Sequence, residues 1–170
     1  MSSQHSPGIR AADTVPTVKD LQVIVDQVWL SYIDPEGLNP FRPAESVPGR
    51  SGMHAAVSVS GRWDGQVVVA CSPTQARNLA AAFLAMHPDE VATEDLDDVL
   101  GELANIVGGN VKSMLPPECF LSPPQVVSQC EDPDHGPNAE RVCELVGTWM
   151  DEPLSIAMWH RGAECVEVAA

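Results

Sequence analysis

The strongest constraint on the fold is a stretch at residues 94–115 that has the pattern of one amphipathic helix. Its apolar residues recur at three- and four-residue steps: Leu96, Val99, Leu100, Leu103, Ile106, Val107, Val111 and Met114. Thr93 is the predicted N-cap, acidic residues follow at the positive end of the helix dipole, and Pro116–Pro117 ends the helix. A helix with such a stripe must pack on a hydrophobic core.

The opposite face of this helix is unusual because it combines polar residues with glycines. At about 100° per residue, the face contains Glu94, Asp98, Gly101, Asn105, Gly109 and Lys112, with Glu102 beside them. Each glycine costs roughly 1 kcal/mol relative to alanine inside a helix, but a glycine lets another backbone approach closely. The helix alone leaves two interpretations open, a docking face or a polar surface that tolerates glycine. Asn110 is predicted on the apolar side, as a buried structural amide.

Composition excludes several classes of function. The formal net charge is −15, which disfavours binding to nucleic acid or to anionic membranes. No apolar run approaches the length of about 18 residues that a membrane span needs, and no signal peptide is visible, so a cytoplasmic protein is expected. The five cysteines form no C-x-x-C pair and the histidines show no ligand spacing. We therefore expect no disulfide framework, no metal site and no cofactor in this chain.

The rest of the chain predicts an α+β domain. Residues 1–16 are a predicted disordered tail, and residues 17–170 a single domain with a proline-rich loop at 34–52. Helices are predicted at 18–33 and from Ser72-Pro73-Thr-Gln75 onward, the latter with a capping box. Strands are predicted at 55–60, 66–71, 126–127, 142–150, 154–160 and 165–168, with an acidic loop at 131–137. Hairpins with grouped helices indicate an antiparallel sheet whose helices pack on one face.

The motif of the 94–115 helix resembles a known family signature. The pattern Asp98-x-x-x-Glu102-x-x-Asn105, continued to Gly109–Asn110, is similar to that of the CheC/CheX/FliY chemotaxis phosphatases. The single copy of the motif and the chain length are most like CheX, and the order of elements fits across residues 18–168. The resemblance implies a CheX-like domain that acts in chemotaxis or related two-component signalling.

The resemblance also implies an activity, the hydrolysis of the aspartyl phosphate on a CheY-like receiver domain of a response regulator. Such a phosphatase needs only to aim a water molecule and stabilise charge, because the receiver brings a lysine and Mg²⁺. The catalytic pair implied is Asn105, which would orient the water, and Glu102, which would contact the lysine. Asp98, Gly101 and Gly109 would contact the partner.

Two other functions remain open at this point. The same face could serve a non-catalytic module that binds a receiver or a flagellar-switch partner, or the helix face could be incidental to a simple acidic domain. Similarity to CheX also implies a homodimer formed by joining sheets, unless Pro124 and Pro153 protect the sheet edges.

Overall fold

The computed structural model describes residues 15–47, 52–128, 135–136 and 138–162. Residues 1–14 of the predicted tail, most of the acidic loop and the predicted strand at 165–168 lie outside this part of the chain. None of the helices formed by the described residues is both long and apolar enough to cross a membrane.

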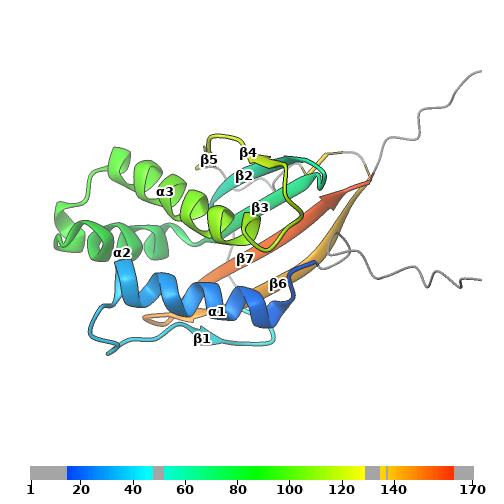
Figure 1. The fold of residues 1–170 in the computed structure, drawn as a ribbon. Helices are drawn as coiled ribbons and strands as arrows, with labels where there is room; N and C mark the ends of the chain where they lie inside the picture. The colour runs from blue at the N-terminus through cyan, green and yellow to red at the C-terminus, as the bar shows by residue number, and fades with distance from the viewer. Residues whose placement is uncertain (1–14, 48–51, 129–134, 137, 163–170) are drawn as a thin grey trace, which may run out of the picture.

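The core is an antiparallel sheet covered on one side by helices (Figure 1). The strands are β1 (Arg42–Pro43), β2 (Met53–Gly61), β3 (Gly65–Cys71), β4 (Cys119–Leu121), β5 (Gln125–Val127), β6 (Ala139–Trp149) and β7 (Glu152–Arg161). Their order is β1-β6-β7-β3-β2-β4, with β5 also paired to β2. The helices are α1 (Val18–Val28), α2 (Pro73–Leu84) and α3 (Thr93–Lys112), with a π turn, η2 (Trp29–Ile33), and a 3₁₀ turn, η3 (Pro88–Glu90). The predicted α+β class is confirmed.

The two long hairpins, β2–β3 and β6–β7, were predictable from their alternating apolar residues. The sequence did not reveal β1, a two-residue strand inside the proline-rich loop that pairs with Gly147 and Thr148 of β6. A side chain at Gly147 would collide with the carbonyl of Arg42. Glycine at this position is therefore what lets the loop join the sheet.

The sheet edges bear on the dimer prediction. In the described chain, β1 lies at one edge and β4 and β5 lie at the other. Pro124 lies between β4 and β5, where it fits the predicted role of protecting an edge. Pro153 does not, because it lies in β7, an interior strand, where it pairs with Thr148 of β6. The homodimer stays a prediction.

The first helix differs from the prediction in its last turn. The predicted helix at 18–33 is an α-helix only to Val28 and then widens into the π turn, closed by a 2.7 Å bond from the Asp34 amide to the Trp29 carbonyl. A π turn holds more residues than an α turn, so the side chains beyond it rotate relative to an α-helix. Ile33 is buried as a result, whereas Tyr32 is half exposed and stacks on Phe83 of α2.

The second helix begins as predicted but uses Gln75 differently. Ser72 is the N-cap and its hydroxyl accepts from the Gln75 amide at 3.0 Å. The Gln75 side chain does not complete a capping box. It is fully buried, and its Nε2 donates to the carbonyls of Trp149 at 3.0 Å and Glu152 at 2.9 Å. Gln75 therefore ties α2 to the turn of the β6–β7 hairpin.

The glycines of α3 have three different environments. Gly108 is buried against Val57 of β2, where an added Cβ would lie 2.5 Å from a Val57 methyl. Gly101 is also buried, and its Cβ would lie 3.3 Å from Val126 and 3.5 Å from Pro124. Gly109 faces open space. The β4–β5 segment of the same chain thus occupies the space beside Gly101, and the partner contact expected of this glycine stays a prediction.

Substitution of these glycines by alanine should separate packing from helix propensity. Gly109→Ala should raise the free energy of unfolding by about 0.5–1 kcal/mol, because the site is open and alanine favours the helix. Gly108→Ala should lower it by about 1–3 kcal/mol, because the new methyl group overpacks against a buried strand. Urea unfolding of the two variants provides the measurement, and a shift in the same direction for both would contradict this packing.

Three of the five cysteines lie among the described residues. Cys71, Cys119 and Cys143 lie in β3, β4 and β6 and are free thiols. Burial raises the pKa of the Cys71 thiol from its ordinary value of 9.0 to about 12. For Cys143, burial and the nearby Asp20 carboxylate raise the pKa to about 11.

The buried Cys71 thiol predicts a loss of stability in alkaline solution. Between pH 9 and pH 12 the thiol ionises in the unfolded chain but stays protonated in the folded one. The unfolded state then binds fewer protons, so the free energy of unfolding falls as pH rises, by up to about 1.4 kcal/mol per pH unit. Urea unfolding between pH 8 and pH 10.5 should show a steeper fall for the parent than for Cys71→Ala. Equal slopes would mean that the thiol titrates normally.

Candidate functional site

The start of α3 is fixed by its own first turn. The helix begins at Thr93, with Ala92 in place of the predicted Thr93 as N-cap. The Asp95 carboxylate accepts from the Ala92 amide at 2.9 Å, so an acidic side chain of the first turn satisfies a backbone donor that the helix cannot. The same carboxylate lies at the positive end of the helix dipole.

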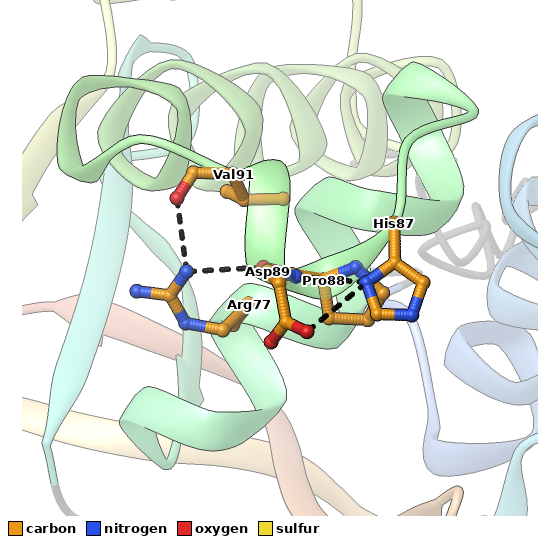
Figure 2. Close-up of polar contacts among 5 residues, drawn as sticks. All are labelled: Arg77, His87, Pro88, Asp89 and Val91. Carbon is orange, nitrogen blue, oxygen red and sulfur yellow. Dashed lines mark hydrogen bonds and ion pairs between the residues drawn. The ribbon is translucent and has the colours of Figure 1, made fainter.

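The loop that leads into α3 is held by α2 (Figure 2). One guanidinium nitrogen of Arg77 donates to the carbonyls of Pro88 at 3.1 Å and Val91 at 2.9 Å. Within the loop, the His87 ring accepts from the Asp89 amide at 3.2 Å. Because Val91 lies two residues before Thr93, the Arg77 contacts fix where α3 begins relative to α2.

The predicted catalytic pair lies on the outer face of α3. Glu102 and Asn105 are exposed, whereas Leu103 and Val107 are fully buried and Ile106 packs partly against the core. None of the hydrogen bonds or ion pairs found between described residues involves the Glu102 or Asn105 side chain. The two side chains are one helical turn apart and both are available to a partner.

The other predicted partner residues divide into two groups. Asp98 and Gly109 are exposed on the same face as the pair, so α3 presents one row, Asp98, Glu102, Asn105 and Gly109, which we call the α3 row. Gly101 is buried under the β4–β5 segment, as described above.

Asn110 also differs from its prediction. It is exposed rather than buried, and its Nδ2 donates to the Ile106 carbonyl one turn earlier at 2.8 Å. The Asn110 NH₂ group therefore finds its hydrogen-bond acceptor within its own helix, and the residue is not part of the α3 row.

The α3 row borders a wall that sequence reasoning did not identify. Pro124 and Val126 of the β4–β5 segment lie against α3 at Gly101, and the Ser128 hydroxyl donates to the Asp97 carboxylate at 3.1 Å. In the sequence, the double proline at 123–124 indicated only the start of a strand or a sheet edge. Its contact with α3 depends on β4 and β5 pairing with β2, which local sequence does not encode.

The chemistry available to the α3 row is limited and specific. A carboxamide both donates and accepts hydrogen bonds, so Asn105 can hold one water molecule in a defined direction. An ionised carboxylate at Glu102 can pair with a cation of a partner. No group of three or more metal-ligating side chains occurs among the described residues. The row has no nucleophile, so the arrangement suits orientation of water and docking rather than covalent catalysis.

Comparison with known proteins is consistent with this geometry. The family model described as "Chemotaxis phosphatase CheX" matches residues 53–133, a segment that includes all of α2 and α3. No curated protein matches the sequence.

Solved structures share the fold. The chemotaxis protein CheX from Vibrio vulnificus superposes with a TM-score of 0.68 at 16% identity, covering 83% of this chain and 93% of that one. The CheX protein from Desulfovibrio desulfuricans gives 0.67 at 14% identity, covering 84% and 97%. A CheX-CheY-BeF₃-Mg²⁺ complex from Borrelia burgdorferi gives 0.64 at 15% identity, covering 88% and 100%.

The sequence match and the fold match concern the same region of the molecule. Residues 53–133 supply the strands β2 and β3, the helices α2 and α3 and the wall beside the α3 row. The structural matches cover a larger share of the chain, 83% and 84%. Together they confirm the resemblance to the CheX/CheC chemotaxis proteins that the motif on α3 predicted.

Proposed function

We propose that this protein is a phosphatase that hydrolyses the aspartyl phosphate of a CheY-like receiver domain. The observation that carries the proposal is the pairing of Glu102 and Asn105, exposed together on a helix whose other faces are packed. A polar pair without internal partners among the described residues contributes little to the fold. The pair is instead available to contact a partner protein.

The mechanism follows from what an acyl phosphate needs. The phosphorus must be attacked in line by water, and little covalent chemistry is left for the protein to perform. In our proposal the Asn105 carboxamide oxygen accepts a hydrogen bond from the attacking water, and its NH₂ group donates a hydrogen bond to the phosphoryl region. Fixing the water in this way removes much of the orientational entropy from the barrier.

Glu102 has a different role in the proposal. One turn from Asn105, its carboxylate pairs with the receiver's active-site lysine and so sets the register of α3 in the receiver's site. The divalent cation of the reaction belongs to the receiver, where it neutralises charge on the phosphoryl oxygens. Gly109, which faces open space, leaves room for the receiver backbone beside the same row.

The comparisons support the choice of partner. The Borrelia burgdorferi structure is a complex of CheX with CheY, BeF₃ and Mg²⁺, and its CheX fold is similar to that of this chain. The family model that matches residues 53–133 carries the description of a chemotaxis phosphatase. Both findings favour the aspartyl phosphate of a receiver domain, rather than another acyl phosphate, as the substrate.

The proposed role of Asn105 predicts a loss of rate without a loss of binding. Asn105→Ala should slow phosphate release from a phosphorylated receiver on the order of a hundredfold, because the water is no longer aimed. Affinity for the receiver should change little, since the interaction is made mainly in the transition state. Phosphate release, measured on CheY-type receivers phosphorylated with acetyl phosphate, provides the rate, and titration calorimetry with BeF₃-activated receivers provides the affinity.

Asn110→Ala is the matched control, because it removes an exposed asparagine from the same helix but outside the α3 row. This variant should release phosphate at the parent rate. An Asn105→Ala variant as fast as the parent would show that Asn105 does not orient the water.

Glu102 predicts a second, distinguishable pattern. Glu102→Gln keeps the shape of the side chain but removes its charge, so both the affinity and the rate should fall, the affinity by about tenfold for one lost charge-assisted bond. Glu36→Gln, at an exposed glutamate in the loop after η2, serves as the control and should change neither quantity. An affinity that depends equally on both glutamates would indicate only general electrostatics.

The non-catalytic alternative has a clear outcome in the same experiments. A parent protein that binds activated receivers but never accelerates phosphate release would be a receiver-binding module. In that case the variants at Asn105 and Glu102 could differ only in affinity.

A further inference from the structure

The β4–β5 segment lies beside α3 at the edge of the sheet and runs in the opposite direction to the helix (Figure 1). A Cβ added at Gly108 would lie 3.7 Å from Leu121, the last residue of β4. A Cβ added at Gly101 would lie 3.5 Å from Pro124, three residues further along the segment. The two prolines at 123–124, which we call the proline step, therefore pass the stretch of α3 that these two glycines bound.

Helical geometry places the two residues of the predicted catalytic pair differently relative to the proline step. At about 100° per residue, Gly101 and Gly108 lie about 40° and 60° from Asn105, in the same sense around the helix axis. Glu102 lies about 60° from Asn105 in the opposite sense. Asn105 is therefore the member of the pair beside the proline step, and Glu102 is the member on the open side of α3.

Ser122 explains how the proline step can leave the sheet. β4 pairs with residues 59–61 of β2 and β5 pairs with residues 54–56, so the prolines fall at the interruption between the two pairings. The Ser122 amide donates to the Ser58 carbonyl at 2.9 Å, and the Ser58 amide donates to the Ser122 hydroxyl at 2.9 Å. One serine thus satisfies both backbone groups of Ser58, and β2 needs no hydrogen bond from the two prolines.

The chemistry of the proline step suits a neighbour of a water-orienting amide. Proline has no backbone N–H, so neither residue of the step can donate a hydrogen bond to the Asn105 carboxamide oxygen. The Pro123 carbonyl already accepts from the Ser122 hydroxyl at 3.1 Å. Other residues at a sheet edge would present backbone N–H groups, which compete with water for a side-chain oxygen. The step therefore gives Asn105 an apolar neighbour that contains no backbone donor.

From these observations we propose that the proline step is a positioning element for Asn105. It covers one side of the carboxamide with apolar surface and leaves the carboxamide oxygen to the water that attacks the phosphoryl group. The proposal rests on the proposed function, because the water-orienting role of Asn105 is part of that function. Its new content is that a segment outside α3 holds Asn105 ready for catalysis, whereas Glu102 lies on the open side without such support.

The proposal predicts a change in kcat without a change in KM. Pro124→Ala removes the ring that lies against Gly101 and adds a backbone N–H, so kcat for phosphate release should fall on the order of tenfold. KM for the phosphorylated receiver should stay at the parent value, because the affected interaction is made in the transition state. A rise in KM with an unchanged kcat would show that the receiver contacts the proline step directly, and would overturn the positioning role.

A double-mutant cycle tests whether the proline step acts through Asn105. In the Asn105→Ala background, Pro124→Ala should cause no further loss of rate, because the group that the step positions is gone. Losses by the same factor in both backgrounds would overturn the proposal. Pro117→Ala, at an exposed proline in the turn after α3, is the matched control and should change neither kcat nor KM. Thermal melts identify any loss of folding, and Pro123→Ala, at the exposed proline of the step, gives the same comparison if Pro124→Ala does not fold.

NMR of the Asn105 side-chain amide separates this proposal from the proposed function, because it needs no turnover. The NH₂ signals of Asn105 are identified in isotope-labelled protein by their loss in Asn105→Ala. Pro124→Ala should shift these signals, whereas those of Asn110, which donates to the Ile106 carbonyl, should stay in place. A parent that releases no phosphate would defeat the proposed function, yet a shift confined to Asn105 would still support the proline step as the element that holds its side chain. Unmoved Asn105 signals would overturn the positioning role even in an active phosphatase.

Discussion

The close contact between Gly108 of α3 and Val57 of β2 is the interaction on which the candidate site depends. It allows the helix to lie directly on the central strands, and Gly101 repeats the arrangement where Pro124 and Val126 approach. Gly101 and Gly108 both pack inside the molecule, so α3 has a single outward face. Glu102 and Asn105 lie on that face. The precision of this face comes from the packing behind it rather than from bonds made by the two side chains themselves.

The elements that support α3 are tied together by side chains that reach between them. Arg77 binds the loop before α3, and Gln75 binds the turn between β6 and β7, so α2 connects the site to the far hairpin. Each of the two side chains donates to two backbone carbonyls, Arg77 to those of Pro88 and Val91 and Gln75 to those of Trp149 and Glu152, which makes these contacts specific in geometry. The turn before β4 is fixed by its shape instead, because Glu118 has φ of 68° and its carbonyl oxygen occupies the space that a side chain at Gly61 of β2 would fill.

Much of this fold could be predicted from the sequence because its main elements have strong local periodicity. The stripe of α3, the hairpins and the proline opening α2 are local signals, and the exposed positions of Glu102 and Asn105 follow from the stripe. The features that the sequence analysis missed or misassigned depend on contacts between distant segments of the chain. The glycines looked alike in the sequence, yet their roles depend on whether Val57, Val126 or open space lies opposite. Gln75 fitted a capping box but found better acceptors in a hairpin that follows it by more than seventy residues. The two residues of β1 carry no periodicity at all.

The order of strands has a consequence for how the site comes into being. Strand β3 lies between β2 and β7, so the last strand in the described part of the chain completes the middle of the sheet. Leu154, Ile156 and Met158 of β7 are fully buried in the core beneath the helices. During synthesis, α3 is made well before these residues emerge, and until they pair, β3 has a bare edge that invites association with other chains. Glu102 and Asn105 are therefore synthesised early, but the surface that holds them in place is complete only after β7 has paired with β3.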